Sequence, residues 1–263
     1  MDAAATRLRL IDSHCHLDVA QFDPDRAEVL ARARASGVVA QVVPATHRAA
    51  WPNLEALCAA HDELHPALGL HPMFLAEHAR EDLDRLHDRI VARRPVAIGE
   101  CGLDHFVEGL DPDLQALYFE GQLRLARSVD LPVIIHARRA VDAVIATLRR
   151  FDGIRGVVHS FSGSPQQARQ LWDLGIHVGI GGPVTYARAQ RLRRTVAGLP
   201  AEQLLLETDA PDQPGDAHRG ERNEPAHLTE ICATVAALRH EDAAAVAAQT
   251  TANTARLFGL PLV

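Results

Sequence analysis

Two histidines separated by a single residue, His14 and His16, follow a short apolar stretch near the start of the chain. On an extended segment, residues i and i+2 point to the same face, so both imidazoles can bind one cation. Four more side chains with metal-binding groups each follow an apolar run of their own: Glu100, His136, His159 and Asp209. This recurrence predicts a metal centre more strongly than any one of the residues does.

The ligand types restrict the metal and the reaction. Imidazoles and carboxylates suit zinc, manganese, iron or magnesium better than calcium, which prefers oxygen ligands only. Four histidines and two carboxylates exceed what one catalytic ion with an open position needs, so we expect two divalent cations bridged by Glu100. Such a pair lowers the pKa of a shared water and holds both the attacking and the leaving oxygen, which predicts a hydrolytic reaction.

The sequence contains no lysine; all 27 of its basic residues are arginine. Schiff-base catalysis is therefore excluded, and so is a metal site bridged by a carboxylated lysine. Glu100 remains the natural candidate for a bridging ligand.

Apolar, strand-like runs alternate along the chain with amphipathic stretches of helical period. The eight expected strands are 8–12, 38–43, 66–70, 96–99, 132–136, 156–159, 176–180 and 204–207. Helices are expected between them, for example over 25–36, 112–130, 164–174 and 187–198. Eight strand–helix units in about 250 residues are typical of an α/β fold of the TIM (β/α)8 barrel type. Two or three extra C-terminal helices should follow the polar segment 211–225.

The barrel explains why the candidate ligands recur at strand ends. TIM barrels carry their active sites at the carboxyl ends of the strands, and all six candidate ligands follow the first, fourth, fifth, sixth or eighth strand. Cys15 and Cys101 lie beside ligands in sequence but should face the apolar core. No low-complexity linker divides the chain, so residues 1–263 are expected to form one domain.

Composition and charge restrict the partners. The formal net charge of −7 argues against a broad binding surface for duplex DNA, which needs many clustered cations. The four cysteines show no CxxC spacing, which fits a reducing compartment. We find no signal peptide and no long apolar window, so we expect a cytoplasmic protein with no membrane contact and no obligate protein partner.

Six short motifs within residues 10–225 contain most of the residues named above. In chain order they are Asp12-Ser-His-Cys-His-Leu-Asp18, Ile98-Gly-Glu-Cys-Gly-Leu-Asp104, Pro132-Val-Ile-Ile-His-Ala-Arg138, Val158-His-Ser-Phe-Ser-Gly163, Leu205-Leu-Glu-Thr-Asp-Ala-Pro211 and Arg222-Asn-Glu-Pro225. Together they resemble the TatD family of metal-dependent deoxyribonucleases, within the amidohydrolase-like barrels. The fragments Pro44-Ala-Thr46 and Gly69-Leu-His-Pro72 resemble its YjjV-like branch, whose substrates are less clearly assigned.

The resemblance implies a role for each ligand. One ion would be held by His14, His16 and Asp209, a second by His136 and His159, and Glu100 would bridge both. The resemblance also implies that Asp209 takes a proton from the attacking water, so that Glu100 and Asp209 are the predicted catalytic residues. The family favours magnesium, manganese or zinc as its two divalent cations.

Other residues have weaker signals. His71, Arg138 and Arg222 are candidate phosphate contacts. His71 could instead cap a strand, Arg138 could form a structural ion pair, and Arg222 could anchor the loop after the barrel. Asp18, Asp104 and Glu207 are expected to orient the histidines or the backbone. The chain departs from the family at His105-Phe106, where many members carry an aromatic residue directly after the Gly-Leu-Asp motif, which leaves the groove beside Asp104 undefined.

Two reaction classes fit this site. The first is a phosphodiesterase that acts as a 3′-to-5′ exonuclease or deoxyribonuclease on nucleic-acid ends or on small phosphodiesters. An acidic chain with 4% aromatic residues suits a pocket for one terminal nucleotide at a time. The second class is the hydrolysis of a carboxylic ester, amide or lactone by the same binuclear centre. A metal-stabilised binding protein without turnover is disfavoured because no ligand is missing.

Overall fold

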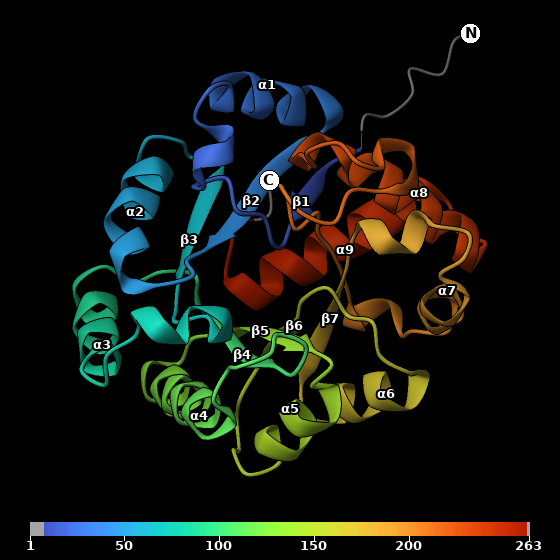
Figure 1. Ribbon diagram of the computed structural model, residues 1–263. Helices are drawn as coiled ribbons and strands as arrows, with labels where there is room; N and C mark the ends of the chain where they lie inside the picture. Colours follow the sequence, from blue (N-terminus) through green and yellow to red (C-terminus); the bar gives the residue numbers. More distant parts are fainter. Residues whose placement is uncertain (1–7, 262–263) are drawn as a thin grey trace, which may run out of the picture.

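The computed structural model describes residues 8–261, and their strands form one parallel eight-stranded sheet in the order β1 to β8. The strands are β1 (Leu10–Asp12), β2 (Val38–Pro44), β3 (Leu64–Leu68), β4 (Ala97–Asp104), β5 (Val133–Arg138), β6 (Gly156–Val158), β7 (Ile176–Ile180) and β8 (Leu204–Leu206). Figure 1 shows the sheet curled into a barrel surrounded by helices. The predicted TIM-barrel fold is confirmed.

Helices follow the strands in the expected alternation. They are α1 (Arg26–Ser36), α2 (Trp51–Ala59), α3 (Asp82–Ala92), α4 (Pro112–Val129), α5 (Val141–Leu148), α6 (Pro165–Asp173), α7 (Gln190–Ala197), α8 (Leu228–Arg239) and α9 (Ala243–Phe258). Local signals explain their ends: α1 stops at Gly37 in the left-handed conformation, and Ser164 begins α6 with a capping box to Gln167. Among the described helices, none is long and apolar enough to cross a membrane.

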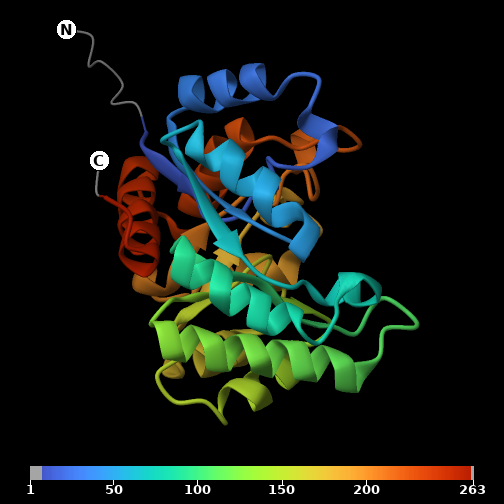
Figure 2. The ribbon, with the colours of Figure 1, turned by 90° about the vertical axis from the view of Figure 1, so that its left-hand side faces the viewer.

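The last helix, α9, covers the amino ends of the strands. Figure 2 shows it on the side where the strands begin, opposite the loops that follow them. Its Leu257 and Phe258 are 6% and 4% exposed, and they join a cluster with inward-facing residues of the strands such as Ile134 and Leu205. Burying one phenylalanine side chain contributes about 1.5–3 kcal/mol to stability. The extra C-terminal helix therefore forms an apolar floor for the barrel.

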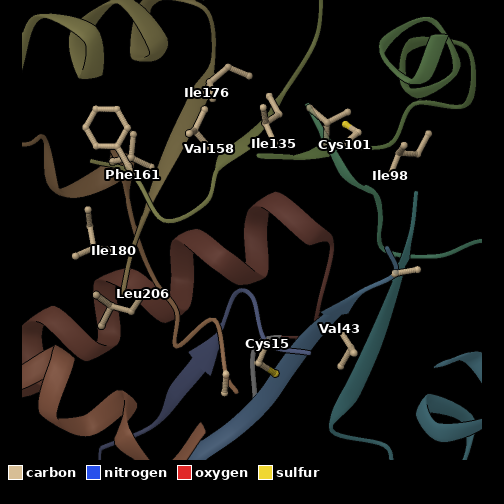
Figure 3. Packing of buried hydrophobic residues seen from close by; sticks show 14 of the residues in the cluster. Cys15, Val43, Ile98, Cys101, Ile135, Val158, Phe161, Ile176, Ile180 and Leu206 are labelled. Carbon is tan, nitrogen blue, oxygen red and sulfur yellow. The ribbon is translucent and has the colours of Figure 1, made fainter. Parts of the chain in front are cut away.

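A second apolar cluster lies between the strands and the surrounding helices. Figure 3 shows part of it, including Cys15, Cys101, Val158 and Phe161. Both cysteines are fully buried, as expected from the sequence. Burial raises the pKa of Cys101 above its ordinary range, so this thiol stays protonated beside the candidate ligand that precedes it.

Backbone and side-chain hydrogen bonds connect the segment at the end of β1 with the segment at the end of β8. The Ser13 backbone N–H and hydroxyl both donate to the Leu206 carbonyl, at 3.0 and 2.9 Å. The buried Asp12 carboxylate accepts hydrogen bonds from the Thr208 N–H at 3.0 Å and from the His14 N–H at 3.2 Å. Burial raises the Asp12 pKa to about 7 despite these bonds. This seam brings the loop after β1 against the loop after β8.

Two strands differ most from their predicted ranges. The third was expected at 66–70 but lies at Leu64–Leu68, and the fourth extends five residues further than expected, to Asp104. The β4–β5 register shifts between Ile98 and Cys101, where β4 carries one extra residue. Such a bulge changes the direction of a side chain, and here it lies at Glu100.

Candidate metal centre

The Glu100 carboxylate lies at the centre of the cluster and is 1% exposed. Its Oε2 faces His14 Nε2 at 3.2 Å and His16 Nε2 at 3.5 Å. Its Oε1 faces His159 Nε2 at 2.7 Å and His136 Nδ1 at 2.9 Å. The two oxygens of one carboxylate therefore point to two separate pairs of histidines, which is the arrangement that a bridging ligand requires.

The first set of donors comes from the loops after β1 and β8. His14 Nε2 and His16 Nε2 lie 3.1 Å apart, and Asp209 Oδ1 lies 3.3 and 3.6 Å from them. His16 Nδ1 is 3.2 Å from the Pro44 carbonyl, to which it donates, so in the neutral ring its Nε2 has the lone pair. Two imidazole nitrogens and two carboxylate oxygens thus converge, and this donor set fits a divalent cation.

The second set comes from β5 and the loop after β6. His136 Nδ1 lies 3.3 Å from His159 Nε2. The other ring nitrogen of His136 donates to Asp104 Oδ2 at 2.9 Å, which leaves the Nδ1 lone pair directed at the centre. Glu207 Oε1 lies 3.7 Å from His159 Nδ1. Asp104 and Glu207 therefore contact the ring nitrogens of these histidines that face away from Glu100, as residues that orient the histidines should.

His71 belongs to the same cluster but differs from the other histidines in its tautomer. Its Nδ1 accepts a hydrogen bond from the Met73 backbone N–H at 3.0 Å, so the neutral ring carries its proton on Nε2. That Nε2 lies 2.8 Å from Glu100 Oε1 and donates to it. Burial lowers the pKa of His71 to about 4, which keeps the ring neutral at pH 7. His71 therefore supports the bridging carboxylate rather than offering a lone pair to a metal.

The carboxylates of the centre are ionised, and the pKa values of three of the histidines, His16, His136 and His159, are raised. Burial opposes ionisation of Glu100, but the charges of His159 and other histidines outweigh it and hold the pKa well below its ordinary value. The pKa of Asp209 is lowered in the same way, against burial, chiefly by the hydrogen bond from His14. Burial opposes protonation of His16, yet Glu100 raises its pKa to about 9. A cluster that attracts positive charge so strongly fits divalent cations.

A cavity of about 750 Å³ opens onto the cluster, within the range of small-molecule sites. Among the residues that line it are His16, His71, Glu100, His136, His159 and Asp209. Arg138, a predicted phosphate contact, also lines this cavity. Arg222 does not: its guanidinium donates to both oxygens of Asp25, at 2.8 and 2.7 Å, and lies 4.6 Å from the Phe22 ring. This position favours the alternative that Arg222 anchors the loop after the barrel.

The backbone around the cavity is strained. Ser160, Asp209 and Gln213 line the cavity with φ values of 45°, 56° and 50°, in the left-handed region that disfavours residues other than glycine. Such conformations cost roughly 1–3 kcal/mol each and cluster at functional sites. The Gln213 amide donates to Asp209 Oδ2 and accepts from the Ser160 hydroxyl at 2.8 Å. Sequence analysis missed Gln213, because nothing in a loop sequence indicated that its amide would meet Asp209.

Comparison with known proteins identifies the family of this chain. The family described as TatD related DNase matches residues 11–259. The chain is 42% identical to the "uncharacterized metal-dependent hydrolase YjjV" of Escherichia coli K12, over 96% of this chain and 99% of the relative. The crystal structure of that homologue superposes with a TM-score of 0.93, over 97% of this chain and 99% of the other.

A second relative carries a more specific name. The chain is 37% identical to a "3′-5′ ssDNA/RNA exonuclease TatD" of Klebsiella pneumoniae, over 95% of this chain and 98% of the relative. The family match over residues 11–259 includes the ligand motifs at the mouth of the barrel. The chain therefore belongs to the TatD family and is a metal-dependent hydrolase.

Proposed function

We propose that this protein is a phosphodiesterase that removes nucleotides from the 3′ ends of single-stranded or frayed DNA, with two divalent cations bound at the cluster. One observation carries the proposal: the two oxygens of Glu100 face two separate histidine pairs at the base of an open cavity. A relative of 37% identity that is named as a 3′-5′ exonuclease supports the choice of reaction. Magnesium, manganese and zinc all suit the mixed nitrogen and oxygen donors.

The donors on this chain suit two cations that share Glu100. His14, His16 and Asp209 would hold one, and His136 and His159 the other. Bound there, a pair of cations would supply an acidified water and positive charge for the phosphoryl oxygens. The substrate would be a nucleic-acid end or a small phosphodiester that enters through the cavity.

The protein side chains orient the reacting groups. The His71 imidazole holds Glu100 in place from Nε2, and the Asp104 carboxylate holds His136. Asp209 Oδ2 already accepts one hydrogen bond, from Gln213, and keeps a lone pair for a proton from the attacking water. Asp209 exposes 11% of its side chain, which suits a base that must meet water from the cavity.

The test uses protein that has been stripped with a chelator and reloaded with magnesium, manganese or zinc in turn. Single-stranded DNA labelled at its 5′ end should shorten stepwise and release mononucleotides. The absence of release with every metal would contradict the proposal. If the same preparations then hydrolysed members of an ester, amide and lactone panel, the second reaction class would replace the first.

A further inference from the structure

The loop after β4 carries an exposed aromatic ring that holds two arginines. Phe106 is 43% exposed. The Cζ atoms of Arg138 and Arg139 lie 3.8 and 4.6 Å from the centre of its ring. Within residues 8–261, neither guanidinium has a carboxylate partner within 4.0 Å. Two unneutralised cations beside one ring add their positive potentials, which favours the binding of an anion next to them.

Arg138 places its positive charge at the wall of the cavity. Arg138 follows His136 by two residues on β5, so the two side chains lie on the same face of the strand. Of the described residues that line the cavity, Arg138 is the only arginine. Arg139 has a φ of 54°, and this left-handed turn brings its side chain to the same ring as that of Arg138.

Asp104 connects the aromatic loop to the metal centre. Its Oδ1 accepts hydrogen bonds from the backbone N–H groups of Phe106 and Val107, at 2.8 and 2.9 Å. Its Oδ2 accepts from His136 Nε2 at 2.9 Å. A single carboxylate therefore sets the position of the Phe106 ring relative to a candidate metal ligand. This is the segment where the sequence departs from the family pattern.

We propose that Arg138 and Arg139, stacked on Phe106, form a second phosphate subsite beside the metal centre. It would bind the phosphate next to the one being hydrolysed, so the preferred substrate is a strand with at least two phosphates. This inference rests on the proposed function. A guanidinium group can donate two parallel hydrogen bonds to two oxygens of one phosphate. Stacking on the ring already restricts the arginine side chains, so less conformational entropy is lost on binding. With a net charge of −7, the rest of the surface offers little attraction to a polyanion.

The test measures binding rather than turnover. A short fluorescein-labelled oligothymidylate is titrated in EDTA, and the dissociation constant is followed by anisotropy across a salt series. The double variant R138Q/R139Q should bind at least about tenfold more weakly at low salt, since hydrogen bonds to charged groups are lost. The slope of the logarithm of the binding constant against the logarithm of the salt concentration should become shallower by about 1.4. This is roughly 0.7 for each of two lost phosphate contacts on a single strand. An unchanged slope would overturn the proposal.

The matched control removes the same charge from the other end of the barrel. Arg127 and Arg149 are exposed near the carboxyl ends of α4 and α5. The variant R127Q/R149Q should keep the wild-type slope; a loss equal to that of R138Q/R139Q would show general charge attraction and overturn the subsite. The variant F106L keeps both charges, so it should weaken binding while leaving the slope close to wild type. Wild-type affinity in F106L would remove the ring from the subsite.

Inorganic pyrophosphate separates this inference from the proposed function. It carries two phosphates and no nucleoside, and its binding to the same proteins is measured by calorimetry. If wild type binds pyrophosphate but not the oligonucleotide, and R138Q/R139Q binds neither, the subsite stands and the nucleic-acid substrate is wrong. If wild type binds neither probe, the subsite is wrong. Thermal unfolding within a few degrees of wild type confirms that each variant is folded.

Discussion

The two ends of the barrel are built differently. At the amino ends of the strands, Leu257 and Phe258 of α9 close an apolar floor, and the helix is capped by Asp242 at its start and Gly259 at its end. At the carboxyl ends, ionised carboxylates and histidines crowd together on backbone that includes Asp209 in a left-handed conformation. The floor is a capped helix with a buried apolar face, whereas the mouth combines buried charged groups with strained backbone. Stability and chemistry are thus separated along the barrel axis.

The largest predicted effect tests the mouth. The variant E100Q keeps the shape of the side chain but removes the charge that faces both histidine pairs. We expect hydrolysis of single-stranded DNA to fall by at least about a thousandfold, as when one member of a catalytic unit is removed. Bound metal, measured by mass spectrometry, should fall as well, and the midpoint of thermal unfolding in chelator should change little. Near-normal rates would remove Glu100 from the mechanism.

The floor should respond in the opposite way. The variant F258A leaves a cavity where an almost fully buried ring packs, so the free energy of unfolding should fall by about 3–5 kcal/mol. Denaturant titration measures this loss. At a temperature where the variant is folded, its kcat/KM should remain near that of wild type. A large drop in kcat/KM without a loss of stability would show that the two ends are not separate.

An intermediate effect is expected at Asp104. The variant D104N has one acceptor oxygen where Asp104 has two, so the side chain can no longer accept both from His136 Nε2 and from the backbone N–H groups of Phe106 and Val107. The second metal should bind about 10–100-fold more weakly, as for other partners of ligating histidines. Competition with a chelator measures that affinity. The control is H105A, which changes the residue next to Asp104. Its metal affinity should match that of wild type.

The smallest effect concerns Arg222, which lies outside the cavity. Its hydrogen bonds, together with those of Arg32, lower the pKa of Asp25 to about 2 from an ordinary value of 3.8. A depressed carboxyl pKa contributes stability above about pH 4, and this contribution is lost as the pH falls toward 2. In R222A the pKa of Asp25, measured by NMR titration, should rise toward its ordinary value while KM for DNA stays unchanged. A raised KM would instead return Arg222 to the substrate site.

The sequence was sufficient to predict the barrel and the residues that meet at its mouth. Eight strand-like runs were predicted, and His14, Glu100 and Asp209 each follow the end of one of them by one or two residues; parallel strands place such ends together. It was not sufficient for contacts that depend on loop conformation. The Met73 N–H that sets the His71 tautomer and the Gln213 amide on Asp209 arise from turns whose dihedral angles no periodicity encodes. The position of His71 in a turn beyond the end of β3 likewise depends on loop conformation, which the sequence pattern does not encode.

The seam between β1 and β8 has a consequence for biosynthesis. Asp12 and Thr208 are 196 residues apart in sequence, yet their hydrogen bonds bring His14 beside Asp209. A chain still emerging from the ribosome therefore lacks Asp209 beside His14 until its final strand has been made. If a cation binds there as proposed, fragments cut short before the eighth strand should retain it less well.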